Sequence, residues 1–329
     1  MVPPTIRDVA QRAAVSLSTV SAVLNGSAPA SEATRLKVLA AVAELGYEPN
    51  SQARNLKRRR SHAVGLIVPD VLNPFFALLA EGIGDELRAR DYLLVLCSTD
   101  FDGGREASYA RLLRARRLDG IVHLSGTGLL PAALHELASS ARVVTVDERV
   151  HGFPAPFVGS DNRRGARWAA ELALARGHRR IAILAGPTGL WTAEQRLAGY
   201  REALAAAGLD PDDVPTVRGD YRLESGRAAA AELLAHEPTV VLAANDLMAI
   251  GCLQHALAAG IRVPRDVSVI GYDDVPLASV VTPALTTVRQ PAREMGRTAA
   301  KLLLDGIEGL DVPEAVNLEP ELIERESLV

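Results

Sequence analysis

Several short apolar runs in this chain end in side chains that can bind a polar molecule. Asp147, Asn245 and Asp273 each follow such a run. Carboxylates and amides there can form hydrogen bonds, and ligands of open α/β sheets bind at the carboxyl ends of the strands. The pattern predicts a cleft that closes on a small polar molecule, although Asp and Asn also end strands as ordinary turn residues. The same pattern recurs at residues 69–70, 98–100, 125 and 186–187.

Two features could indicate catalysis, and both are incomplete. Asp273 and Asp274 are paired carboxylates, but no nucleophile or metal-ligand cluster accompanies them. The segment Gly126-Thr127-Gly128 is a fragment of a dinucleotide-binding loop without its third glycine. The sequence therefore predicts a protein that is not an enzyme and that uses no cofactor and no metal.

Short apolar runs alternate with amphipathic helices along this part of the chain, and together they position the polar side chains. This alternation is typical of parallel strands with crossover helices. The fold class is α/β, with two lobes of parallel sheets and flanking helices. The Pro/Gly-rich segment 152–159 is a plausible crossover between the lobes. The expected strands are 64–68, 92–97, 120–124, 143–146, 181–184, 240–243 and 267–270, and expected helices include 75–90, 163–176 and 195–207.

The first 48 residues have a different pattern, that of a helix-turn-helix. Thr5 and Asp8 form a capping-box pair, and a second helix is expected to begin near Ser16. In such a domain the second helix enters the major groove with its N-terminal residues at base edges. A third helix is expected at 32–45 and ends at Gly46. Its core-forming residues are expected to be Leu36, Leu39, Ala40, Ala43 and Leu45.

The two parts of the chain differ in net charge. Residues 1–60 hold nine Lys and Arg against four Asp and Glu, a net charge of +5, so the rest carries −9 of the total of −4. Only the small basic part is expected to meet a polyanion. Cys97 and Cys252 are expected to be reduced and buried. No signal peptide or membrane span is expected, which favours the cytoplasm.

Nine motifs follow one another along the chain, at residues 5–10, 15–21, 46–50, 73–76, 177–181, 196–200, 244–246, 271–274 and 285–288. In this order they resemble the lactose-repressor (LacI/GalR) family of bacterial transcription regulators. The resemblance covers essentially the whole sequence and implies three parts. Residues 1–48 would form the DNA-binding domain, 49–60 a hinge helix and linker, and 61–329 an effector-binding and dimerisation core like a periplasmic binding protein. The N-lobe would comprise 61–159 and 290–320, and the C-lobe 160–289 with the C-terminal end.

The resemblance implies base contacts by Leu17, Ser18 and Ala22. Leu and Ala can contact a thymine methyl group, and Ser can pair with several bases. Because the family often has a basic residue at the position of Ala22, a bidentate contact to guanine is predicted to be missing. Leu17 could instead be partly buried, and Thr5 and Ser16 could serve only as helix caps. Phosphate contacts are expected from Thr5, Ser16, Thr19, Ser21, Asn25 and Thr34.

The hinge segment contains Leu56, an apolar residue in a polar and basic stretch. In the family, a leucine at the matching position wedges into the minor groove at the operator centre, where it kinks the duplex. The alternative is that Leu56 packs only against its dimer mate. The segment is too short to be helical alone, so we expect it to fold when paired and bound to DNA. Its expected groove neighbours are Asn50, Ala53, Asn55 and Lys57.

The effector site that the resemblance implies suits a sugar or sugar derivative. Carboxylates and a guanidinium can hold vicinal hydroxyl groups, and aromatic faces can cover the apolar side of a ring. Arg196, Asn245 and Asp273 are the strongest candidates, with a salt bridge or strand-end turns as their alternative roles. Leu190 replaces a basic residue of a purine-responsive relative, which disfavours a purine. The expected contacts are Phe75, Phe76, Asp147, Leu190, Trp191, Thr192, Arg196, Tyr221, Asn245 and Asp273.

The resemblance implies a regulator, most often a repressor, that binds a pseudo-palindromic operator in double-stranded DNA as a homodimer. A small-molecule effector would release it or, less commonly, recruit it. The chain ends without a leucine heptad tail, so a dimer rather than a tetramer is expected. The main alternative is a stand-alone periplasmic-type sugar-binding protein, which would need export and would lack the basic N-terminal domain.

Overall fold

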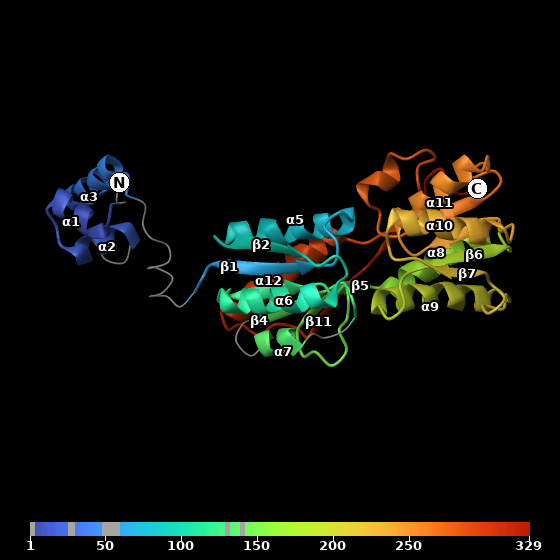
Figure 1. The fold of residues 1–329 in the computed structure, drawn as a ribbon, viewed down its shortest axis with the longest axis horizontal. Helices are drawn as coiled ribbons and strands as arrows, with labels where there is room; N and C mark the ends of the chain where they lie inside the picture. The colour runs from blue at the N-terminus through green and yellow to red at the C-terminus, as the bar shows by residue number, and fades with distance from the viewer. Residues whose placement is uncertain (1–3, 26–29, 48–59, 129–131, 139–141) are drawn as a thin grey trace. The chain divides into compact units, whose positions relative to one another are not determined.

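The computed structural model describes residues 4–25, 30–47, 60–128, 132–138 and 142–329. They form two compact units, residues up to Ser61 and residues from His62 to Val329 (Figure 1). Cys97 and Cys252 are buried free thiols. Among the described residues, no helix is long and apolar enough to cross a membrane.

The first unit is a three-helix domain around a small apolar core. Helix α1 ends where Ala14 takes a left-handed conformation, with φ of 53°, which turns the chain into α2. The core residues include Val9, Val20 and Val38, one from each helix, and all three are fully buried. The predicted helix-turn-helix is therefore present. Its helices are α1 (Ile6–Ala13), α2 (Leu17–Asn25) and α3 (Glu32–Leu45).

Helix α3 turns a different face to this core than the sequence predicted. Leu36 is 60% exposed and Leu39 is 44% exposed, whereas Val38 and Ala41 are buried. The prediction for Leu36, Leu39, Ala40 and Ala43 was therefore wrong. Small side chains occupy the buried positions because α1 lies close against α3. The sizes of the side chains on α3 did not by themselves reveal which face of the helix contacts α1.

The second unit begins with a parallel six-stranded sheet, which we call the N-lobe together with its helices. Its strand order is β11-β5-β4-β3-β1-β2. Helices α5 and α12 pack on one face of the sheet, and α6 and α7 on the other. The elements are β1 (Ala63–Val68), α5 (Pro74–Ala89), β2 (Leu93–Ser98), α6 (Gly103–Ala115), β3 (Gly120–His123), α7 (Ala132–Ala138), β4 (Arg142–Val146), β5 (Phe157–Ser160), α12 (Ala292–Ile307) and β11 (Ala315–Leu318).

A second parallel sheet, with strand order β7-β6-β8-β9, forms the C-lobe. Helices α8 and α9 cover one face, and α10 and α11 cover the other. The elements are α8 (Asn162–Ala175), β6 (Ile181–Ala185), α9 (Trp191–Ala206), β7 (Thr216–Arg218), α10 (Leu223–Leu234), β8 (Val240–Ala243), α11 (Asp246–Ala258), β9 (Ser268–Ile270) and the 3₁₀ helix η1 (Pro276–Ser279).

The chain passes between the two sheets three times: after β5, after β10 (Thr287–Arg289) and between β11 and β12 (Glu321–Ile323). Strands β10 and β12 pair with each other antiparallel. The predicted two-lobed α/β class is confirmed. The predicted crossover at 152–159 was misplaced, because residues 157–160 form β5 and extend the six-stranded sheet.

Glycines allow the helices of each lobe to approach closely. A Cβ atom at Gly82 of α5 would overlap the carbonyl oxygen of Arg293 in α12. The neighbouring Gly84 lies in the same helix, yet the nearest atom to a Cβ there would be 3.9 Å away. Thus, of these two glycines of α5, Gly82 is required by the packing against α12 and Gly84 is not.

We predict opposite effects for alanine at these two positions. Gly82→Ala should lower the free energy of unfolding by about 1–3 kcal/mol, because backbone must move to admit the methyl group. Gly84→Ala is the matched control and should raise stability by up to about 1 kcal/mol through helix propensity. Urea unfolding of the full chain measures both. Equal effects of the two substitutions would contradict this account of the packing.

Candidate functional site

The N-terminal turn of α2 is presented on the surface of the first unit. Leu17 is 44% exposed, Ser18 is exposed, and Ala22 is half-buried. Ser16 caps the helix, since its Oγ accepts the amide of Thr19 at 3.1 Å. Its hydroxyl also shares hydrogen bonds with those of Ser18 and Thr19, at 2.7 and 2.8 Å. These hydroxyl groups form one polar surface at the start of the helix.

The other expected phosphate contacts have local roles in the structure. The amide and hydroxyl of Thr5 donate to Asp8 Oδ2, each at 2.7 Å, and these hydrogen bonds lower the pKa of Asp8. The amide of Thr34 donates to Ser31 Oγ at 3.3 Å. Ser21 is half-buried. The side chain of Asn25 lies outside the described part of the chain, as do Asn50, Ala53, Asn55, Leu56 and Lys57.

In the second unit, residues from both lobes form a buried polar cluster, which we call the cleft cluster. It comprises Asp147, Thr192, Arg196, Asn245 and Asp273, each at most 8% exposed. Asp147 follows β4, Asn245 follows β8, and Asp273 follows β9. Asp147 and Asp273 have positive φ angles, 64° and 106°. Such conformations persist in non-glycine residues only where the surroundings enforce them, and they concentrate at functional sites.

Arg196 is the cation of the cleft cluster, and its guanidinium has several partners. Nε donates to Asn162 Oδ1 at 2.7 Å, and Nη1 donates to the carbonyl of Ala244 at 2.6 Å. Nη1 also lies 3.2 Å from Asp273 Oδ1. The guanidinium carbon is 4.0 Å from the ring centroid of Tyr272. Arg196 therefore forms a salt bridge, the alternative role given to it in the sequence analysis, and its partner Asp273 is also a member of the cleft cluster.

The two aspartates of the cluster differ in their hydrogen-bond and ion-pair partners. Asp273 Oδ1 accepts Gln290 Nε2 at 2.8 Å and is paired with Arg196. Asp147 Oδ1 is buried without a hydrogen-bond partner. Burial, with a smaller contribution from Asp273, raises the pKa of Asp147 to about 7, against the attraction of Arg196. An unsatisfied acceptor of this kind suits a donor on a ligand, such as a hydroxyl group.

Asn245 forms hydrogen bonds that join the cleft cluster to α11 and to Tyr221 of the C-lobe. Asn245 Oδ1 accepts the amide of Met248 and so caps α11, while its Nδ2 donates to the carbonyl of Tyr221 at 3.0 Å. The Tyr221 hydroxyl lies 3.5 Å from Thr192 Oγ1. Asn245 thus has the structural role considered as its alternative, and it also orients Tyr221.

Glu148 is a member of this site that sequence reasoning missed. Its carboxylate accepts the amides of Trp191 and Thr192 and the hydroxyl of Thr192, the last at 2.8 Å. It is 3% exposed, and burial together with Asp147 raises its pKa to about 7. Its position directly after Asp147 was the only sequence signal. Asn162 and Gln290 were missed because the strands that precede them, β5 and β10, were not predicted.

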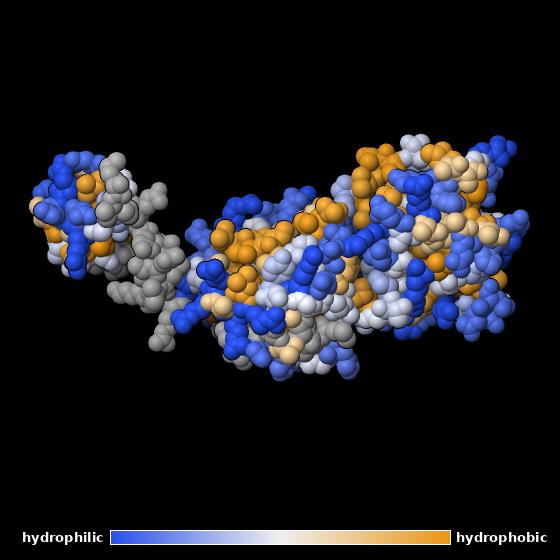
Figure 2. Space-filling model, in the orientation of Figure 1, coloured by the Kyte–Doolittle hydropathy of each residue, from blue (hydrophilic) through white to orange (hydrophobic). Residues whose placement is uncertain are grey.

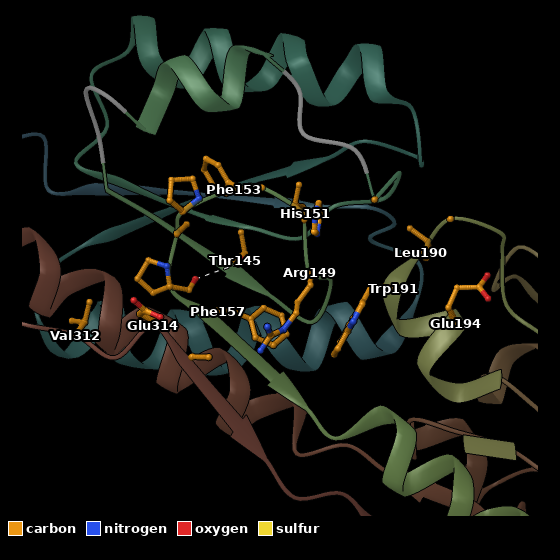
Figure 3. Close-up of a pocket in the computed structure, with 18 residues that line it drawn as sticks. Thr145, Arg149, His151, Phe153, Phe157, Leu190, Trp191, Glu194, Val312 and Glu314 are labelled. Atoms are coloured by element: carbon orange, nitrogen blue, oxygen red, sulfur yellow. Dashed lines mark hydrogen bonds between the residues drawn. The ribbon is translucent and has the colours of Figure 1, made fainter. Parts of the chain in front are cut away.

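The aromatic and apolar candidates lie in two places. Phe75 and Phe76 are 3% and 7% exposed and pack in the core of the N-lobe, at the start of α5. Leu190 and Trp191 line a pocket of about 940 Å³ beside the start of α9. In Figure 3 the side chain of Arg149 lies between Phe157 and Trp191, with its guanidinium 4.4 and 5.6 Å from their ring centroids.

Further contacts join the two lobes. Arg222, which precedes α10, forms an ion pair with Asp100, which follows β2. A Cβ atom at Gly128 would overlap the carbonyl oxygen of Gly189, so backbone meets backbone there. The segment that resembled part of a dinucleotide-binding loop is therefore part of the contact between lobes. Among the described residues, no group of three or more metal-ligand side chains was found.

Comparison with known proteins places this geometry in a family. The profile described as "Bacterial regulatory proteins, lacI family" matches residues 5–50, and that of a periplasmic binding protein-like domain matches 170–328. The ribose operon repressor of Escherichia coli (strain K12) is 36% identical over 327 residues, which cover 98% of this chain and 99% of the relative.

Two solved structures are similar over nearly their whole length. The lac repressor dimer bound to operator and an anti-inducer has a TM-score of 0.89 and 30% identity, covering 99% of this chain and 100% of that chain. A complex of the regulator CelR with cellobiose has a TM-score of 0.74 and 38% identity, covering 98% and 99%. The fold is that of a transcription regulator with a periplasmic binding protein-like core. The chain belongs to the lacI family of bacterial regulatory proteins.

The pairing of Arg196 with Asp273 predicts strong coupling between substitutions. Arg196→Ala leaves a buried carboxylate without its cation and should cost about 3–5 kcal/mol of unfolding free energy. The double variant with Asp273→Asn should lose about 1–3 kcal/mol less than the sum of the two single variants. Arg163→Ala, which breaks an exposed pair with Glu202, is the control and should cost at most about 1 kcal/mol. Simple additivity in the Arg196 cycle would refute the pairing.

The raised pKa values predict a loss of stability with rising pH. Asp147 and Glu148 hold protons up to a pKa of about 7 in the folded chain, and lose them near 4 when unfolded. Between these values the unfolded state binds fewer protons, so unfolding becomes easier as pH rises. The melting temperature of the full chain should fall from about pH 5 to 7, and less so in Asp147→Asn. An unchanged slope in this variant would count against the raised pKa of Asp147.

Proposed function

We propose that this protein is a transcriptional repressor that binds a pseudo-palindromic operator as a homodimer and is released by a sugar or sugar derivative. The observation that carries the proposal is that one chain combines a helix-turn-helix, with an exposed helix start at Leu17 and Ser18, and a two-lobed core with a buried polar cluster. The relatives named above include a ribose operon repressor and a regulator in complex with cellobiose.

The proposed DNA contacts follow from the position of α2. Leu17, Ser18 and Ala22 would read base edges, while hydroxyl groups around the two helix starts would contact phosphates and set the register. Leu56 and its hinge neighbours would enter the minor groove at the operator centre. Such a protein acts at the nucleoid in the bacterial cytoplasm and performs no catalysis.

The proposed effector contacts are the members of the cleft cluster. Asp147 offers an unsatisfied acceptor to a ligand hydroxyl group, and Arg196 and Asp273 form a charged pair beside it. Charge-assisted hydrogen bonds of this kind hold sugar hydroxyl groups firmly. Leu190 and Trp191 would cover the ligand from the start of α9. The positive φ angles of Asp147 and Asp273 support a site whose geometry is set in advance.

The homodimer is supported by apolar surface on both lobes. The N-lobe exposes Leu72, Leu93 and Leu96, which are 84%, 66% and 45% exposed, and the C-lobe exposes Leu277 and Val280. Figure 2 shows apolar surface where Figure 1 places β2 and α5. Strand β2 is also an edge strand, and an edge with apolar side chains needs cover to avoid aggregation. A stand-alone sugar-binding protein is not favoured, because it would have no use for the helix-turn-helix.

The proposal is tested by selecting random duplex DNA with the purified protein at moderate salt and sequencing what is retained. We expect an inverted repeat, and loss of binding when the correct sugar from a panel including D-ribose and cellobiose is added. Ser18→Ala should change base preference at one symmetric pair of positions. Ser279→Ala, in η1, is the control and should change nothing. No enriched sequence, with or without the sugar panel, would refute the proposal.

A further inference from the structure

Helix α9 begins without a cap from its own segment. Leu190 occupies the N-cap position, and its apolar side chain can accept no hydrogen bond. The first amides of a helix have no partner within the helix and carry partial positive charge, so they favour an anion. Here the partner is the carboxyl group of Glu148, which follows β4 in the N-lobe, accepts the amides of Trp191 and Thr192, and is an anion above its pKa of about 7. A carboxylate of one lobe therefore caps a helix of the other.

Within the cleft cluster, as far as the structure describes it, no cation is uncommitted; Arg149 lies outside the cluster, over the rings of Phe157 and Trp191. Arg196 is engaged by Asn162, the carbonyl of Ala244 and Asp273. The remaining ionisable groups of the cleft cluster are the carboxyl groups of Asp147 and Asp273. A negatively charged effector would find the α9 amides taken and would face buried carboxylates, which is a costly arrangement in a desolvated site.

A second observation points to the kind of ligand the site accepts. Asp147 Oδ1 is buried and has no hydrogen-bond partner, so once the carboxyl is ionised it requires a donor rather than a further acceptor. An uncharged polyhydroxyl compound supplies such donors, whereas a phosphate or carboxylate group in that place would add negative charge beside an unsatisfied acceptor.

We propose that Glu148 determines the charge class of the effector: its carboxylate occupies the anion-binding start of α9 and reserves the site for uncharged, hydroxyl-rich ligands over their phosphorylated forms. This inference rests on the proposed role of the cleft cluster as the effector site. Glu148 also acts as a positioning residue, because it holds the Thr192 hydroxyl at 2.8 Å and fixes the first turn of α9 against the N-lobe.

The fluorescence of Trp191 can report on the contact between Glu148 and the first turn of α9. Its ring lies edge-to-face with Phe157 of β5, at a centroid distance of 5.8 Å, so it senses the junction of the two lobes. The chain has one other tryptophan, Trp168, which stacks against Arg164 on α8. Trp168→Phe thus leaves Trp191 as the sole tryptophan in the chain.

The test compares Glu148→Ala and Glu148→Gln with wild type and with Glu194→Gln, by calorimetric titration with inorganic phosphate, D-ribose 5-phosphate and D-ribose at about pH 8, where the Glu148 carboxyl is ionised. Glu194 lies on the first turn of α9 but pairs with Arg218, so its substitution is the matched control. We expect Glu148→Ala to bind phosphate at least about tenfold more tightly than wild type, because two amides are freed. Glu148→Gln keeps the side-chain shape and should show a smaller gain, and Glu194→Gln none.

The second measurement is Trp191 emission in the Trp168→Phe background. Glu148→Ala should shift the emission as the first turn of α9 loosens, and added phosphate should restore it by replacing the missing carboxylate. A purely structural role of Glu148 would give the shift without the rescue, and that result overturns the proposal. So does wild-type binding of phosphate as tight as that of both Glu148 variants. Neither readout uses DNA, so failure of the operator selection is distinguishable from failure here.

Discussion

The core of this protein is organised around one buried positive charge. The Arg196 guanidinium lies among Asp273, Asn162 and the carbonyl of Ala244, and it is 3% exposed. Taking a charge out of water is expensive, so every group around it must be placed to compensate. This requirement fixes the end of β9, the start of α8 and the end of β8 relative to α9. The same arrangement leaves Asp147 Oδ1 without a hydrogen-bond partner, and in the proposed function this atom is available to the effector.

Both lobes contribute to this arrangement, so ligand binding and lobe contact are physically linked. Asp147 and Glu148 come from the N-lobe, whereas Thr192 and Arg196 come from α9 of the C-lobe. The Glu148 carboxylate satisfies amides that α9 itself leaves unpaired. A ligand that alters these hydrogen bonds changes the free energy of the contact between the two lobes. By linkage, a change in that contact alters the affinity for the ligand by the same factor. In a regulator, that coupling is what connects an effector to DNA affinity.

Much of the fold was predictable because local patterns carry it. The apolar runs predicted β1, β2, β3, β4, β6, β8 and β9, and the capping pattern at Thr5 and Asp8 marked the start of α1. The strands that were missed, such as β5, β7 and β11, are short or follow Pro/Gly-rich segments. The start of α9 was placed four residues late, because its cap is Glu148 and lies 42 residues earlier than the helix's own N-cap, Leu190.

By itself, the sequence determined the helix-turn-helix, the α/β class and the polar residues at strand ends, because periodicity and turn chemistry act over a few neighbouring residues. Tertiary structure alone decided which face of α3 is buried, that Arg196 pairs with Asp273, and that Glu148 reaches the amides of Trp191 and Thr192. These contacts join segments far apart in the chain. Their energies depend on burial and on the approach of two charged or polar groups, and neither is set until the sheets and helices have packed.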